Sequence, residues 1–392
     1  MNKFLLLFFH FMILSNIIFA QREEEVEDKM PFILKKDSSI VGEMDLKNLR
    51  ITPFLAPSVS PEVGVMLVGG GLISFKVDRK SKILQRSSIP FSFGFSTNGS
   101  SNFNLKPSLF LKNDKNRIIA DIGMKDMPDN YWGVGYEAAR EPSKPDSTTS
   151  YRRNWWYVNI KYSHQFKKYF FGGILFDYNQ TKATELNPTM QEDQYIKEFG
   201  TFIRNWSVGL LFQYDSRDIT INAYEGVFVE LSSNFYRSVG FENPTYQILV
   251  LDYRQYKQIS RPGRTLAWQV KTRIGNDAVP WTEMSQLGTP FDLRGYLWGR
   301  YRDKNMLFGI MEYRHMFMRK KPRKDGRMMS RFGIVTWVAT GSIANNYTEM
   351  TNWLPNAGVG FRFEVQERMN ARFDLGFGDD TTAFYISFNE AF

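Results

Sequence analysis

Apolar and polar residues alternate along most of the chain, from about residue 50 to residue 392. The clearest run is the final one, in which Phe384, Ile386, Phe388 and Phe392 fall on one face and mostly small or polar residues on the other. A repeat of two residues is typical of a β-strand with two unlike faces. The pattern therefore predicts a chain built from amphipathic strands.

Charged residues recur on the less apolar face of these segments. In the segment 354–366, for example, Arg362 and Glu364 oppose Phe361 and Phe363. A packed soluble core rarely contains so many charges, because each must lose its hydration. Strands of this kind fit a wall that meets lipid on one side and water, or paired charges, on the other.

The alternating segments predict an all-β fold, a transmembrane antiparallel β-barrel of sixteen strands. An even number of strands is typical of a closed single-chain barrel. The predicted strands are residues 50–58, 61–77, 86–98, 102–112, 116–124, 151–163, 168–178, 204–216, 224–236, 244–257, 263–275, 304–316, 330–341, 354–366, 369–378 and 382–392.

The lengths of the connections predict how this barrel is oriented. The three longest, 125–150, 179–203 and 276–303, follow the fifth, seventh and eleventh strands and so lie at one end of the barrel. Outer-membrane barrels have long external loops and short periplasmic turns, so we expect that end to be extracellular. The basic connection 317–329 would then be periplasmic, either as a solvated turn or as a docking site for a partner.

The first twenty residues resemble a cleavable signal peptide. Lys3 precedes an apolar run over residues 4–19, and Ala20 is a small residue before the expected cleavage site. A membrane anchor is the alternative, but the run is short for a spanning helix.

Residues 21–49 are highly charged at their start and are expected to form a short periplasmic segment, either a disordered tether or a recognition tail. Residues 50–392 would be the barrel.

Composition narrows the possible chemistry. The chain has no cysteine, which excludes disulfides and thiolate metal sites, and we expect no metal and no cofactor. The formal net charge is +9, but an exported chain would not meet nucleic acid. We expect the protein in the Gram-negative outer membrane, where basic residues meet the phosphates of outer-membrane lipids and lipopolysaccharide.

Two short motifs lie between the strands. The first is Asp215, Arg217 and Asp218, followed by Gly226, at the turn after the eighth strand. Its opposite charges can neutralise one another and accept backbone N–H groups, which would fix a tight turn. The second is the tetrapeptide Leu293, Arg294, Gly295 and Tyr296 in the long loop after the eleventh strand. Here the glycine permits a sharp bend, and the guanidinium offers five donors.

These motifs, with Glu312 and Arg314 in the next strand, resemble the BamA/TamA-like superfamily of outer-membrane assembly and translocation proteins, also called the bacterial surface antigen family. The resemblance covers residues from about 50 to 392. It implies that the 293–296 loop folds back into the lumen and that its arginine pairs with carboxylates of the inner wall. The candidate partners are Glu312, Glu364 and Asp374.

The resemblance also extends to the end of the chain. Phe384, Phe388 and Phe392 are similar to the C-terminal signal by which such barrels are recognised for assembly, although Glu390 stands where an apolar residue is expected. Most members carry periplasmic POTRA domains, for which residues 21–49 leave no room. Ala339 also stands where many relatives have an aspartate, so the loop arginine would need other partners.

Four classes of function are compatible with a barrel of this kind. An enzyme is not expected, because beyond residue 20 the chain holds only His164 and His315, and neither has a nucleophile motif beside it; a Ser-His lipid hydrolase is the remote alternative. A passive porin-like pore fits less well, because the inner face mixes charges of both signs. The resemblance implies outer-membrane protein assembly, insertion or translocation with periplasmic or outer-membrane protein partners, through a weak seam between 50–58, which contains Pro53 and Pro57, and 382–392. A structural subunit without transport activity is the other alternative.

Overall fold

The computed structural model describes residues 49–60, 64–78, 81, 84–140, 149–239, 244–276, 278–379 and 381–392. The chain divides into two units, residues 1–47 and 48–392, and every described residue belongs to the second. The predicted signal peptide, and the predicted periplasmic segment apart from residue 49, lie outside the described residues.

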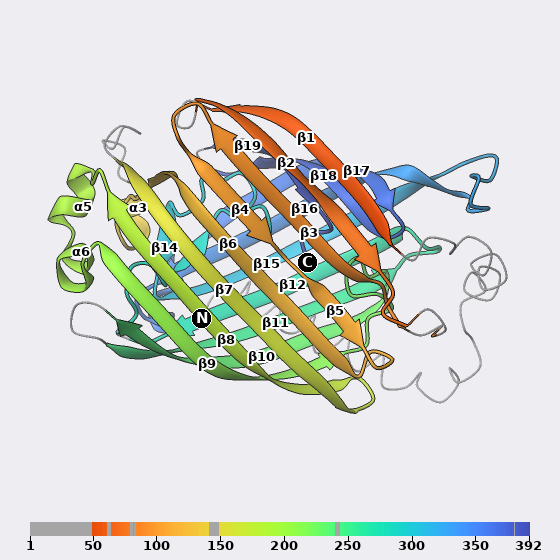
Figure 1. The fold of residues 1–392 in the computed structure, drawn as a ribbon, viewed down its shortest axis with the longest axis horizontal. Coiled ribbons are helices and arrows are strands. Elements are labelled where there is room, and N and C mark those ends of the chain that lie inside the picture. The colour runs from red at the N-terminus through yellow and green to blue at the C-terminus, as the bar shows by residue number, and fades with distance from the viewer. Residues whose placement is uncertain are drawn as a thin grey trace. The chain divides into compact units, whose positions relative to one another are not determined.

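Seventeen strands of the second unit form one large antiparallel sheet (Figure 1). Strands that follow one another along the chain are neighbours in the sheet, as the pairings of β7 with β8 and of β8 with β9 illustrate. The strands are β1 (Arg50–Ser60), β2 (Gly64–Phe75), β3 (Ser87–Ser96), β4 (Ser101–Leu105), β5 (Ser108–Leu111), β6 (Asn116–Asn130), β7 (Ser150–Lys167), β8 (Phe170–Thr184), β9 (Phe202–Asp215), β10 (Gly226–Val239), β11 (Thr245–Gln258), β12 (Arg264–Gly275), β15 (Asn305–Met318), β16 (Met329–Ala344), β17 (Leu354–Gln366), β18 (Met369–Phe377) and β19 (Thr382–Phe388).

These strands occupy sixteen positions, because β4 and β5 share the place between β3 and β6. Pro107 lies between the two short strands, and its missing N–H removes one donor from the ladder. Each of the sixteen predicted strands overlaps one position of the sheet. The predicted all-β barrel architecture is confirmed.

Several strands are longer than the alternating pattern predicts. β6 continues to Asn130 rather than residue 124, and β8 to Thr184 rather than residue 178. The added part of β6 continues the antiparallel ladder with β7, and ion pairs support it there, since Arg152 binds Asp126 at 2.7 Å and Arg153 lies 3.4 Å from Asp129. Polar residues occupy both faces there, so the alternation that marks the rest of the strand is absent.

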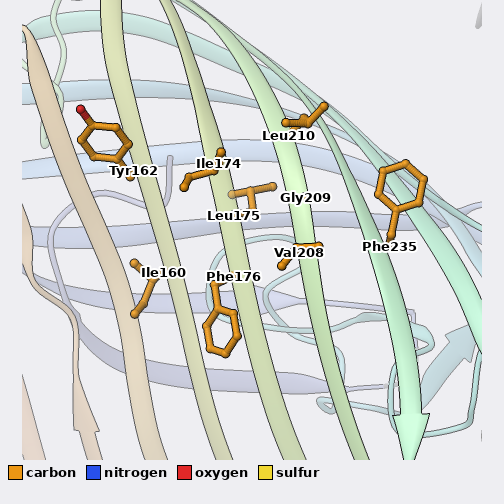
Figure 2. Close-up of a pocket in the computed structure, with 9 residues that line it drawn as sticks. All are labelled: Ile160, Tyr162, Ile174, Leu175, Phe176, Val208, Gly209, Leu210 and Phe235. Carbon is orange, nitrogen blue, oxygen red and sulfur yellow. The ribbon is translucent and has the colours of Figure 1, made fainter.

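The two faces of the sheet differ as the sequence predicts. Along β9, Val208, Leu210 and Phe212 are exposed, whereas the residues between them are buried. Figure 2 shows the outer side of β7 to β10, where apolar side chains such as Ile174 and Phe235 line a shallow groove. None of the helices in the described part of the chain is long and apolar enough to cross a membrane.

The two ends of the sheet carry different connections. At one end, here called the loop end, are the helices α3 (Tyr136–Arg140), α5 (Pro188–Glu192) and α6 (Gln194–Phe199), the last two beyond β8 and β9 in Figure 1. The loop between β12 and β15 also lies there and contains a two-stranded hairpin, β13 (Ser285–Leu287) and β14 (Tyr301–Asp303). The other end, here called the turn end, carries shorter connections such as 168–169 and 259–263.

The chain turns inward after the last strand. β19 ends at Phe388, and Asn389 has a φ of 64°, which diverts residues 390–392 from the strand direction. Phe384 is exposed, but Phe392 is buried, with its ring 6.1 Å from that of Tyr256. The expectation that Phe392 shares the outer face with Phe384, Ile386 and Phe388 is therefore wrong, because the strand ends at Phe388 and the backbone changes direction at Asn389.

Candidate functional site

The long loop between β12 and β15 places Arg294 against the inner face of the barrel wall. Its side chain is fully buried, and its Nη1 donates to Asp374 Oδ2 at 2.7 Å. Its Nη2 donates to Glu312, and the guanidinium carbon lies 3.6 Å from the ring centre of Trp337. The structure thus brings together three of the residues selected from the sequence, from a loop and two separate strands.

Glycines allow this loop to approach the wall closely. Gly295 has a φ of 121°, and a Cβ there would lie 2.7 Å from the backbone of Gly376. A Cβ on Gly376 would in turn lie 2.1 Å from the carbonyl oxygen of Arg294. Any side chain at either position would push the loop off β18.

The other two residues of the tetrapeptide, Leu293 and Tyr296, also hold the loop against the wall. Tyr296 donates its hydroxyl to the carbonyl of Pro355 at 2.6 Å, and its own carbonyl accepts from Tyr385 at 3.2 Å. Leu293 is fully buried in an apolar cluster that includes Leu287. All four residues of the 293–296 motif therefore pack against the barrel.

Further arginines extend the ion pairs around Arg294. Arg314 donates to Glu312 at 2.8 Å, and Arg362 donates to Asp374 at 2.5 Å. Glu312 thus pairs with two guanidiniums, and Asp374 with three, since Arg372 Nε lies 3.6 Å from it. Neither carboxylate is therefore left buried without compensation. The structure places Glu312 and Arg314, the two residues of β15 that carry the family resemblance, on the inner face.

Glu390 joins this network from the inward-turned segment after β19. It accepts from Arg362 Nε at 2.9 Å and from Asn370 at 2.7 Å. The carbonyl oxygen of Phe392 accepts from Arg314 Nη2 at 3.1 Å. Sequence reasoning did not assign Glu390 to the network, although its departure from the apolar pattern was the available signal.

Glu364 was also expected to pair with Arg294, and that expectation is wrong. It lies near the turn end of β17, where Arg323 and Arg327 bind it at 2.8 and 2.9 Å. Those two arginines belong to the basic connection between β15 and β16, which sequence reasoning treated as a solvated turn or a docking site. Two cations of this connection are thus paired with a carboxylate of the barrel itself.

The Asp215 motif forms the base of a ten-residue turn rather than a tight one. Arg217 binds Asp215 through two hydrogen bonds, of 2.8 and 2.9 Å, and Arg117 adds a third at 2.5 Å. Gly226 has a φ of 109°, and a Cβ there would lie 2.5 Å from the carbonyl oxygen of Ser216. Asp218 does not pair with Arg217; its Oδ1 accepts the backbone N–H of Tyr224 at 3.0 Å.

This turn, residues 216–225, reaches distant parts of the turn end. Asp218 pairs with Arg368 at 2.5 Å, and that guanidinium lies 3.4 Å from the ring centre of Tyr224. The backbone N–H of Thr220 donates to Gln85 at 2.9 Å. One turn therefore contacts the β2–β3 and β17–β18 connections, on both sides of the seam between β1 and β19.

At the loop end, the same loop that carries Arg294 holds an acidic side chain close to the wall. Burial, together with the negative charge of Asp177, raises the pKa of Glu283 to about 8. Asp177 accepts a hydrogen bond from Tyr236 at 2.6 Å, and Tyr236 packs in one cluster with Met284. Protonation of Glu283 therefore favours the packed loop.

Comparison with solved structures identifies the kind of fold. The chain is similar to BamA from Haemophilus ducreyi lacking POTRA domains 1–3, with a TM-score of 0.51 and 12% identity over 87% of this chain and 69% of that chain. It is also similar to CdiB from Acinetobacter baumannii, with a TM-score of 0.50 and 13% identity over 88% of this chain and 59% of that one. No protein-family model and no curated protein sequence matches.

The fold is therefore that of an outer-membrane-type β-barrel, like the barrels of BamA and CdiB. In this chain the space enclosed by the wall is entered by the 276–304 loop, while the 216–225 turn reaches across the turn end. The inward-facing charges around Arg294 are paired with one another rather than free to line an open channel.

Proposed function

We propose that this protein is a barrel of the BamA/TamA-like superfamily that acts in the assembly, insertion or translocation of outer-membrane proteins, as part of a complex. The turn end would face the periplasm. The observation that carries the proposal is the edge between the first and last strands of the sheet.

No hydrogen-bonded register joins β1 to β19 in the described residues; β1 pairs with β2, and β19 with β18. Side chains bridge the gap instead. The rings of Phe54 and Phe388 lie 5.2 Å apart, and Gln366 donates to Thr52 at 2.8 Å. Pro53 has no N–H to offer to a ladder.

A strand edge without a partner is a template for another strand. At this seam, such a strand could come from a client protein that is being inserted. The loop around Arg294 supports lateral passage, because the same loop obstructs the route along the barrel axis. The chain spans 69% of the BamA structure and 59% of CdiB, and we propose that partner proteins supply what the longer chains carry.

A reducible cross-link across the seam tests this proposal. Phe54→Cys with Phe388→Cys should be joined by a short bis-methanethiosulfonate linker, which forms a disulfide with each cysteine, because the contact between the two rings places the side chains within its reach. We expect the cross-linked variant in proteoliposomes to lose insertion of an unfolded test barrel, and a reductant to restore it.

The matched control is Phe361→Cys with Phe373→Cys, which joins two strands that are already paired in the sheet. This second link should leave insertion unchanged in both redox states. Full insertion activity with the seam locked would refute the lateral route.

A further inference from the structure

A cluster of basic side chains lies at the turn end, where β11 turns into β12 and β12 begins to pair with β15. Arg261 in the turn 259–263 lies with its Nη2 3.2 Å from His315 Nε2. Arg264, the first residue of β12, stands opposite His315 in the register of β12 and β15. His315 lies on the same face of β15 as Tyr313 and Phe317, which are exposed, so the cluster is on the outer face.

Nothing acidic neutralises this cluster within the described part of the chain. Arg261 donates to two backbone carbonyls, of Pro262 at 3.0 Å and of Met316 at 2.8 Å. Arg264 Nε is buried and has no hydrogen-bond partner. Burial and the charge of Arg264 lower the pKa of Arg261, as expected where like charges face each other without a carboxylate.

The lack of a carboxylate partner distinguishes this cluster from Arg217, Arg294 and Arg362, which all bind carboxylates. Arg294 and Arg362 also have a buried nitrogen without a hydrogen-bond partner, but their charge is compensated. Uncompensated guanidiniums and an idle N–H donor are the features of a site for an anion, and phosphate oxygens match the planar fork of arginine.

The surroundings of the cluster indicate which anion it takes. The His315 ring lies 6.0 Å from Tyr313 and 5.6 Å from Phe317, so one outward stripe is aromatic. Directly beyond it in the chain come the exposed cations Arg319, Lys320 and Lys321. Aromatic side chains followed by basic ones mark the boundary between acyl chains and headgroups.

We propose that Arg261, Arg264 and His315 form a binding site for the phosphate of an anionic phospholipid in the leaflet at the turn end of the barrel. The guanidiniums would hold the phosphate oxygens, and the acyl chains would lie along Tyr313 and Phe317. This site requires the barrel to be in a bilayer, but it is independent of whether the seam opens. A soluble acidic protein is disfavoured because the aromatic stripe would then meet no apolar partner.

Native mass spectrometry of the full chain released from nanodiscs of phosphatidylcholine with phosphatidylglycerol tests the site. The wild type should retain phosphatidylglycerol. The double variant Arg261→Gln with Arg264→Gln should bind it about 30-fold more weakly, since each cation near a membrane surface contributes about 1 kcal/mol. The control Lys257→Gln with Arg331→Gln removes two exposed cations outside the cluster and should retain the lipid. Equal losses in both variants would overturn the site.

The histidines provide a second readout that distinguishes a lipid from free phosphate. In detergent, short-chain phosphatidylglycerol should shift the side-chain ¹⁵N resonances of His315 but not those of His164, which hydrogen bonds to Asn116 at 2.7 Å. Inorganic phosphate should need at least about tenfold higher concentration, because it gains nothing from the aromatic stripe. Equal affinity for phosphate would overturn the lipid assignment, and unchanged His315 resonances with both ligands would overturn the site.

Discussion

A single loop residue holds the most buried ion pairs of the barrel. Arg294 forms ion pairs with both Glu312 and Asp374, and none of the three side chains is accessible to solvent. Replacing Arg294 by alanine would leave two carboxylates with less compensation in a dry environment, and such a loss typically costs about 3–5 kcal/mol.

We therefore expect Arg294→Ala to unfold at a clearly lower urea concentration than the wild type in detergent micelles, as measured by tryptophan fluorescence. Lys257→Ala, which removes an exposed cation from the end of β11, is the control and should leave the transition in place. An unchanged midpoint for Arg294→Ala would mean that the arginine does not anchor the loop.

Sequence reasoning was most effective for residues that sit in a short motif. It identified Arg294 and two of its partners, because a strand's alternation tells which carboxylates face inward. It wrongly included Glu364, since alternation gives the face of a residue but not its height along the barrel. The break in the apolar pattern at Glu390 was visible in the sequence, but the change of backbone direction at Asn389, which brings Glu390 to Arg362, leaves no periodic signal.

At the scale of elements, strands were predictable and their ends were not. The alternation that locates β9 over fourteen residues comes from lipid on one side and a polar interior on the other. Beyond the apolar band, as in the last part of β6, both faces are polar and the pattern vanishes. Each strand of the hairpin β13–β14 is only three residues long, which is too short for an alternating pattern to be recognised.

The 276–304 loop should respond to pH through Glu283. The pKa of this carboxyl is about 8 in the folded protein, above the usual value of a glutamate, so the packed loop binds a proton that the released loop gives up. Packing is then strongest at low pH and weakens as pH rises from about 4.5 to about 8.

Hydrogen exchange of this loop, corrected for the intrinsic effect of pH, should show opening at least about tenfold more frequent at pH 8.5 than at pH 5, the equivalent of one pKa unit. In Glu283→Gln the dependence should disappear. Should that variant retain the full pH dependence, another group would be responsible.

At the scale of the whole barrel, two elements obstruct the axis in series. The Arg294 loop enters from the loop end, and the 216–225 turn spans the turn end, held to Arg368 by an ion pair and by the ring of Tyr224. Because ions would have to pass both elements, removing one of them should leave the other to limit the conductance.

We accordingly expect the wild type to show almost no ion conductance in planar bilayers. Arg294→Ala and Arg368→Ala should each add brief openings, and the double variant should give conductance well above the sum of the two. Large and stable wild-type conductance would instead indicate a passive pore. Additive single effects would mean that the two elements do not lie on one path.

The inward turn at Asn389 has a practical consequence for work on this protein. Because residues 390–392 end beside Tyr256 and Arg314, a tag or fluorophore joined after Phe392 would begin among paired charges and would displace them. The exposed 3₁₀ turn Tyr347–Glu349, at the opposite end, touches none of these groups and is the better point for attachment. Labelling there would leave the packed interior intact.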